Sequence, residues 1–250
     1  MRYGYDLRLY EDYGVKVSVA LPPSHTHALI TGASGSGKSW TLLYLIGSLL
    51  HSNPDTIIFL CDFKSSHDFD FLRSYKYYYS GTNCYNGIME YYEHFNQARE
   101  NASDGLRYIL VAEEYPAFLT YLDSQDKVNK TKKASDILSA VSEILMMGRG
   151  TGNGFGFWCV TQRADSSWFS YGSRDNFMLI ISLGRLSREQ KAMLFSGEDI
   201  PERVYKSGQG LLLADGQALR EVAFPLIKDV GDWKRHILSI LSRNIAHVLN

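Results

Sequence analysis

The feature that most constrains this chain of 250 residues is the stretch GASGSGKS at positions 32–39. Its spacing is that of a phosphate-binding loop, Gly-x-x-x-x-Gly-Lys-Ser. A short apolar run, His27–Ile30, precedes the loop, and a largely apolar segment, Ser39–Leu50, follows it. A strand before the loop and a helix after it are the context that the motif requires, because backbone N–H groups then face the phosphates. A chance glycine–serine turn would not need this context.

The polar groups of the loop have separate expected roles. We expect Lys38 to reach the β- and γ-phosphates of ATP, and the Ser39 hydroxyl to hold Mg²⁺. The predicted nucleotide-binding set continues one residue into the helix and comprises Gly32, Ala33, Ser34, Gly35, Ser36, Gly37, Lys38, Ser39 and Trp40.

Continuous apolar runs alternate with helical patterns over residues 26–200, which predicts an α/β fold with a mainly parallel sheet and helices on both faces. We expect this RecA-like P-loop domain to occupy residues 26–228, behind a β extension at 1–25. The expected strands are 15–21, 27–30, 56–63, 106–115, 155–160 and 177–184, with a hairpin turning at Asp215-Gly216.

Helices are expected at 39–50, at 86–100, after an N-cap at Ser135, and after a capping box formed by Ser187 and Gln190. An amphipathic helix capped by Asp232 should form the C-terminal part, 229–250. The nucleotide should then lie at the carboxyl ends of the strands.

Composition limits where the protein can reside and what it can bind. The formal net charge of −1 gives no overall positive field, so nucleic-acid binding would need a local basic patch. No apolar run is long enough to span a bilayer, and the N-terminus does not resemble a signal peptide. The three cysteines, Cys61, Cys84 and Cys159, lack metal-ligand spacing and are interpreted as buried free thiols in a reducing cytoplasm.

Two carboxylates end the apolar run 106–112. A P-loop hydrolase needs one acidic group at a strand end to orient Mg²⁺ and another group to position the attacking water. Glu113 suits the metal role, although Asp is usual there, and Glu114 suits the base. Two solvated loop carboxylates are the alternative. Gln162, at the end of the 155–160 run, is a candidate for contact with the γ-phosphate or the water, or else a polar strand end without a role.

Several cations outside the loop are candidates for contacts beyond the nucleotide. Arg149, flanked by glycines, is a candidate for a cation donated across a subunit interface, or it pairs with a helix dipole. The stretch DKVNKTKK forms either a mobile basic loop that follows a phosphate backbone or a plain solvated loop. The predicted DNA-binding set is Lys130, Lys132, Lys133, Arg163 and Arg174. In the stretch Asp62-Phe63-Lys64, the two charged residues are expected to pair locally.

Together these motifs resemble the motor domain of the FtsK/SpoIIIE DNA translocases, within the FtsK–HerA group. The matching stretches, in chain order, are HALITGASGSGKS, DFK, EEY, MGRGTGNGFGFWCVTQRAD and the hairpin GQGLLLADGQALREVAF. The family has Asp where this chain has Glu113. The resemblance covers residues 26–225 and implies a RecA-like ATPase that assembles as a ring, with a hexamer expected, around double-stranded DNA. It also implies that Arg149 acts in trans.

The sequence shows neither the membrane-spanning region nor the winged-helix module found in the family. We therefore expect a free-standing cytoplasmic motor of the kind that plasmids, conjugative elements and viruses encode, with a separate loading or anchoring protein. The leading hypothesis is an ATP-driven DNA translocase for conjugation, plasmid processing or genome packaging. The alternatives are a protein-secretion motor and a nucleotide-binding scaffold with weak hydrolysis.

Overall fold

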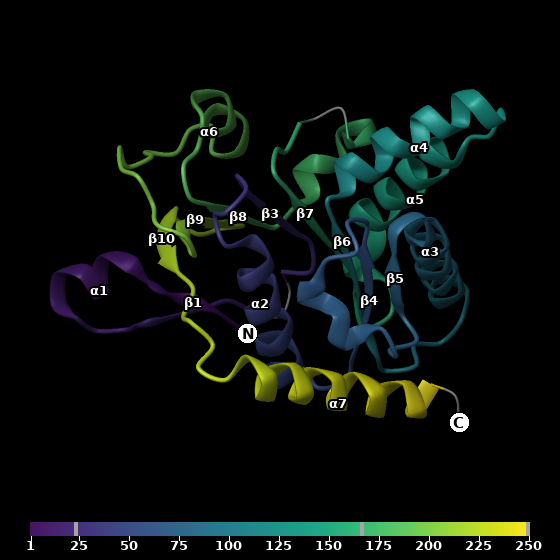
Figure 1. Ribbon diagram of the computed structural model, residues 1–250, viewed down its shortest axis with the longest axis horizontal. Coiled ribbons are helices and arrows are strands. Elements are labelled where there is room, and N and C mark those ends of the chain that lie inside the picture. Colours follow the sequence, from purple (N-terminus) through teal and green to yellow (C-terminus); the bar gives the residue numbers. More distant parts are fainter. Residues whose placement is uncertain (23–24, 166–167, 249–250) are drawn as a thin grey trace.

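A mixed sheet forms the centre of the computed structural model, which describes residues 1–22, 25–165 and 168–248 (Figure 1). Within these residues ten strands pair in the order β2-β1-β10-β9-β8-β3-β7-β6-β4-β5. The six strands from β8 to β5 in this order are parallel: β3 (Ala28–Gly32), β4 (Thr56–Asp62), β5 (Tyr78–Ser80), β6 (Arg107–Glu113), β7 (Phe155–Thr161) and β8 (Leu179–Leu183). The predicted mainly parallel α/β fold is confirmed.

Four antiparallel strands extend one side of this sheet. They are β1 (Arg2–Asp6), β2 (Ser18–Ala20), β9 (Gln209–Ala214) and β10 (Arg220–Ala223). The predicted hairpin between β9 and β10 is present, and Gly216 in its turn has a φ of 73°. The first twenty residues hold two strands and the helix α1 (Leu7–Tyr13) between them, whereas the sequence analysis expected only one strand there.

Helices cover both faces of the parallel strands (Figure 1). On one face α2 (Lys38–Ser52) packs against β1, β3 and α7 (Val230–Val248). On the other face lie α3 (Cys84–Glu100), α4 (Tyr115–Asn129) and α5 (Lys133–Met147). The short helix α6 (Arg188–Leu194) follows β8, and 3₁₀ turns occur at His67–Leu72, Gly81–Asn83, Gly148–Gly150 and Ser170–Asn176.

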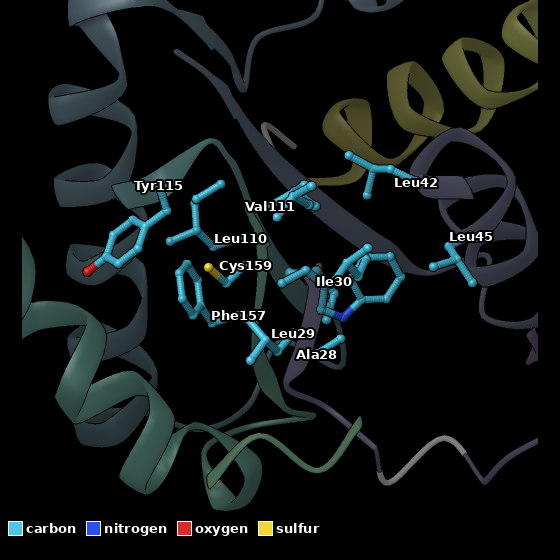
Figure 2. Close-up of a cluster of buried hydrophobic side chains, with 14 of the residues drawn as sticks. Ala28, Leu29, Ile30, Leu42, Leu45, Leu110, Val111, Tyr115, Phe157 and Cys159 are labelled. Carbon is cyan, nitrogen blue, oxygen red and sulfur yellow. The ribbon is translucent and has the colours of Figure 1, made fainter. Parts of the chain in front are cut away.

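The apolar runs form strands because both of their faces are covered. Every residue of β3, β4 and β7 is buried. Figure 2 shows Leu42 and Leu45 of α2 on one side of the strands and Tyr115 of α4 on the other, with Ile30 and Phe157 between them. All three cysteines are buried free thiols, as predicted.

Tertiary contacts move two predicted helix starts. Helix α5 begins at Lys133, before the expected cap Ser135, because the Asp126 carboxylate of α4 accepts hydrogen bonds from the backbone N–H groups of Lys133 and Ala134. Helix α7 begins at Val230, and Asp229 accepts from the N–H of the expected cap Asp232 at 2.8 Å. The Ser187 cap is confirmed, since its hydroxyl accepts from the Gln190 N–H.

A buried histidine joins β3 to β7. The Nδ1 atom of His27 accepts a hydrogen bond from the Phe157 N–H at 3.1 Å, so the ring is neutral and carries its proton on Nε2. Burial, followed by the positive charge of Arg107, lowers the pKa of His27 to about 4. At pH values below the ordinary histidine pKa, His27 is therefore protonated more readily in the unfolded chain than in the folded chain.

We predict a loss of stability in acid that depends on His27. As the pH falls from 6.5 toward 4, the unfolded chain takes up a proton that the folded chain refuses, so the free energy of unfolding decreases. The His27 contribution reaches about 3 kcal/mol, since one pKa unit is worth about 1.4 kcal/mol. Urea unfolding at pH 7 and pH 5 should show about 2 kcal/mol of it, because pH 5 lies above the folded-state pKa. His27→Asn keeps an acceptor for Phe157 without titrating, and its stability should vary less between the two pH values. An equal loss in both proteins would contradict the prediction.

A candidate nucleotide site at the carboxyl edge of the sheet

Four parallel strands bring the predicted nucleotide-site groups together at one edge of the sheet. Strands β3, β7, β6 and β4 are neighbours in that order, and the register places Thr31 beside Thr161, and Glu113 beside Val160 and Asp62. A pocket of about 280 Å³ opens over these strand ends. It is lined by Ser34, Gly35, Gly37, Lys38, Ser39, Trp40, Lys64, Glu113, Glu114, Gln162 and Ser207.

The glycine-rich loop lies tightly against the segment that precedes β9. The Gly208 N–H donates to the carbonyl of Ser36 at 2.9 Å. At Gly37, which has a φ of 94°, a Cβ atom would lie 2.8 Å from the backbone nitrogen of Gly208. Only glycine permits this approach, and α2 begins at the next residue.

The Lys38 side chain folds back over the loop. Its Nζ atom donates to the carbonyl oxygens of Gly32 at 2.6 Å and Ala33 at 3.1 Å. Burial lowers the pKa of Lys38, and the nearby Glu114 carboxylate opposes that shift. The ammonium group is thus held within the loop that the motif assigns to phosphate.

Glu114 lies at the centre of the polar contacts. Its Oε1 atom accepts from Lys64 Nζ at 2.5 Å and from Gln162 Nε2 at 3.2 Å. Its backbone is left-handed, with a φ of 56°, and its N–H donates to the Val160 carbonyl at 2.9 Å. This conformation is unfavourable for a residue other than glycine, and here it turns the chain from β6 into α4 and directs the carboxylate into the pocket.

Glu113 and Asp62 form an acidic pair at neighbouring strand ends. Burial, followed by the negative charges of Glu114 and Asp62, raises the pKa of Glu113 to about 7. Glu113 Oε2 and Asp62 Oδ1 are buried without a hydrogen-bond partner among the described residues. A divalent cation would compensate the unpartnered Glu113 oxygen, so Glu113, which lines the pocket together with Ser39, fits the Mg²⁺ that a P-loop employs.

The structure brings Lys38, Ser39, Glu113, Glu114 and Gln162 to one pocket, but it places Arg149 elsewhere. Arg149 is exposed in the 3₁₀ turn that precedes β7. The seven residues of β7 separate that turn from the pocket edge, which corresponds to about 23 Å at about 3.3 Å per residue. Arg149 therefore lies at the opposite edge of the sheet and cannot contact a nucleotide bound to its own chain.

The predicted DNA-contacting residues fall into two groups, both outside the pocket. Arg163 pairs with Glu189 at 3.2 Å and lies 3.7 Å from Asp165, while Arg174 is partly buried in a 3₁₀ turn that packs against α5. Residues 166 and 167, between these two arginines in the chain, lie outside the described residues. Lys130, Lys132 and Lys133 occupy the junction of α4 and α5.

The lysine stretch is not the loop that the sequence suggested. Lys130 ends α4 in a left-handed conformation, and α5 begins at Lys133. Asp126 closes this turn through Thr131 and the N–H groups that it caps. The lysines thus lie at the tip of a helical hairpin that extends from the body of the protein (Figure 1).

Two residues that line the pocket, Lys64 and Ser207, were not expected there from the sequence. Lys64 does not pair with Asp62 as expected, because Lys64 reaches across to Glu114. Asp62 instead accepts from the Ser66 N–H at 2.7 Å and the Tyr78 hydroxyl at 3.1 Å. Ser207 lines the pocket from the segment before β9. The charged residue that follows strand 56–62 was a usable signal for Lys64, whereas no local pattern marks Ser207.

We predict that Gly37→Ala weakens the fold more than Gly35→Ala. Both glycines have positive φ, but a Cβ atom at Gly35 would meet nothing within 4 Å. Comparing the two variants therefore separates the cost of a positive φ at alanine from the cost of the clash with Gly208. We expect the clash to add about 1–3 kcal/mol of destabilisation. Denaturant unfolding of the two variants provides the comparison. Equal losses would show that the loop moves away from Gly208 at no cost.

Comparisons with known proteins find similar sequences. The FtsK/SpoIIIE family matches residues 7–73. The chain is 25% identical over 235 residues to the Ftsk domain-containing protein YdcQ of Bacillus subtilis, and the match covers 86% of this chain and 46% of that protein. The chain thus spans about half the length of this curated relative.

Two solved structures share the fold over almost the whole chain. The pCW3 conjugation coupling protein TcpA, solved with ATPγS, has a TM-score of 0.69 at 19% identity, covering 96% of this chain and 70% of that one. ATPases 2 and 3 of EssC from Geobacillus thermodenitrificans have a TM-score of 0.67 at 14% identity, covering 98% and 49%. Among the described residues, none of the helices is long and apolar enough to cross a membrane. The resemblance indicated by the motifs is confirmed: the chain is similar in sequence to FtsK/SpoIIIE proteins and has the RecA-like P-loop fold of these solved ATPases.

Proposed function

We propose that this chain is an ATP-driven motor that moves double-stranded DNA in the cytoplasm. The observation that carries the proposal is the convergence of Lys38, Glu113, Glu114 and Gln162 on one pocket beside the glycine-rich loop. That set supplies a cation for the phosphates, a carboxylate for the metal, a base for the attacking water and an amide that orients the base. A P-loop protein that only binds nucleotide without hydrolysing it would not need the metal carboxylate, the base or the amide.

Each group has a distinct role in hydrolysis. Lys38 leaves the loop carbonyls for the phosphates, and Ser39 with Glu113 would hold Mg²⁺, which would neutralise phosphate charge. Glu114 accepts a proton from the attacking water, and Gln162 keeps that carboxylate oriented through its 3.2 Å hydrogen bond. Trp40, which donates to the Pro225 carbonyl at 3.3 Å, borders the nucleotide next to the loop.

A ring of several copies, with a hexamer expected, gives Arg149 a role. Because it lies at the edge of the sheet away from its own pocket, Arg149 serves a nucleotide only if it belongs to a neighbouring copy. Its exposure and its position between two glycines leave it free to cross an interface. A guanidinium that enters a neighbour's site stabilises charge that develops during phosphoryl transfer.

The lysine tip of the α4–α5 hairpin is the best candidate for contact with DNA. Helix α4 starts directly after the base Glu114 and ends at the tip, so one rigid helix of about 22 Å connects the two. Lys130, Lys132 and Lys133 are exposed there. Arg163 and Arg174 contribute less in this proposal, because the first is already ion-paired and the second is partly buried. A separate protein would load or anchor the motor.

The likeness to TcpA, described as a conjugation coupling protein, supports transfer of DNA between cells as the setting. EssC and the type VII secretion ATPase EccC share the same fold. The fold by itself does not separate DNA transport from protein secretion, so the assignment depends on the polymer that stimulates hydrolysis.

We predict that Glu114→Gln binds ATP but hydrolyses it about 10²–10⁴-fold more slowly, which is the usual contribution of a positioned base. Lys38→Ala should instead lose nucleotide binding, because the ammonium group that binds the phosphates is removed. Binding of a fluorescent ATP analogue and steady-state phosphate release separate the two effects. If Glu113→Gln alone abolished hydrolysis with binding intact, the roles of the two glutamates would be reversed.

We predict that duplex DNA stimulates ATP hydrolysis cooperatively with protein concentration, and that the lysine tip mediates this effect. Replacing Lys130, Lys132 and Lys133 with Ala should weaken DNA binding and reduce the slope of log affinity against log salt by about one unit per lost phosphate contact.

A matched triple variant, with Lys16, Lys76 and Lys228 replaced, controls for net charge alone. An unchanged salt slope in the tip variant would remove the lysines from the DNA interface. Hydrolysis that responds to neither duplex nor single-stranded DNA would favour a protein-secretion motor or a weakly hydrolysing scaffold instead.

A further inference from the structure

The ion pair between Lys64 and Glu114 joins a movable cation to a fixed carboxylate. The Lys64 side chain is 48% exposed, whereas the Glu114 side chain is 6% exposed. Lys64 lines the same pocket as Lys38 and the glycine-rich loop. It is therefore a second cation within the phosphate site, and the sequence motif does not account for it.

The backbone on both sides of this pair is held in place. Ser65 and Glu114 are left-handed, with φ values of 55° and 56°, at the ends of the neighbouring strands β4 and β6. The Asp62 carbonyl accepts from the Ser65 N–H at 3.2 Å, and its carboxylate accepts from the Ser66 N–H at 2.7 Å. Because these turns and hydrogen bonds hold the backbone and Glu114 is buried, the half-exposed lysine stem is the part that most readily changes the distance between the two charges.

Glu114 keeps a second partner when Lys64 leaves. Gln162 Nε2 donates to the same oxygen atom, Oε1, that Lys64 contacts. Departure of the ammonium group would leave the carboxylate hydrogen-bonded and oriented but free of its counter-ion. A carboxylate without a paired cation is the better acceptor for a proton from water.

A nucleotide changes the charge balance of the pocket. Lys38 and Lys64 face Glu113 and Glu114, so the two signs are equal among the charged side chains that line it. A triphosphate adds several negative charges, and its terminal phosphate presents three strong acceptor oxygens. The mobile cation is then drawn from the carboxylate toward the phosphate.

We propose that Lys64 binds the terminal phosphate of ATP and, by moving there, releases Glu114 for the attacking water. In the empty site the same ammonium group restrains Glu114, so the base becomes available only when a third phosphate is present. This inference rests on the proposed ATPase function and assigns the group that distinguishes a triphosphate from a diphosphate.

The test compares the affinities of ATPγS and ADP, both with Mg²⁺, by isothermal titration calorimetry. For Lys64→Met we expect affinity for ATPγS to fall about tenfold or more, which is the effect of a lost hydrogen bond between charged groups. Affinity for ADP should change by less than about twofold, because ADP lacks the phosphate that Lys64 contacts. Lys64→Arg retains the cation and should recover most of the lost affinity for ATPγS.

Lys76→Met is the matched control, since Lys76 lies outside the pocket and contacts the ring of Tyr77. Equal losses for ATPγS and ADP in Lys64→Met, or no loss for either, would overturn the inference. Lys38→Ala separates this failure from failure of the proposed function, because it should lose both nucleotides. If the unmodified protein bound neither nucleotide, the proposed function would fail, and the role of Lys64 with it.

Discussion

Parallel pairing of β3, β7, β6 and β4 is the constraint on which the rest of this structure depends. Parallel strands end at the same edge of a sheet, so each strand delivers the residues that follow it to one place. The glycine-rich loop, Gln162, Glu114 and Lys64 come from four separate parts of the chain, and this pairing alone makes them neighbours. A change of register would move all these groups relative to the loop.

The pocket combines several local arrangements that are costly unless the fold enforces them. Glu114 adopts a left-handed backbone, Glu113 is a buried carboxylate with a raised pKa, and Lys38 is a partly buried cation held by carbonyl oxygens. Fully covered strands and the helices on both faces provide the stability that maintains these arrangements. Such strained and buried polar groups gathered in one pocket are the arrangement expected of a binding site.

The α4–α5 hairpin connects the pocket to the outside of the molecule. Helix α4 begins at the residue after Glu114, and the lysine tip lies at its other end. A rigid helix transmits a small rotation at one end as a larger displacement at the other. The same geometry explains why the lysine stretch is a closed turn: Asp126 binds the start of α5, and this contact sets the angle between the two helices.

The sequence by itself determined the fold class, the phosphate loop and the strand ends that bear Glu113, Glu114 and Gln162. These follow from local rules, because apolar runs, glycine spacing and terminal polar residues are contiguous along the chain. Only the tertiary structure decided the partners of those groups. It paired Lys64 with Glu114 rather than with Asp62, brought Ser207 to the loop, capped α5 with Asp126 rather than Ser135, and placed Arg149 at the far edge of the sheet. Each of these outcomes depends on contacts between segments that are separated along the chain or on the direction in which a strand runs, and no local pattern encodes either one.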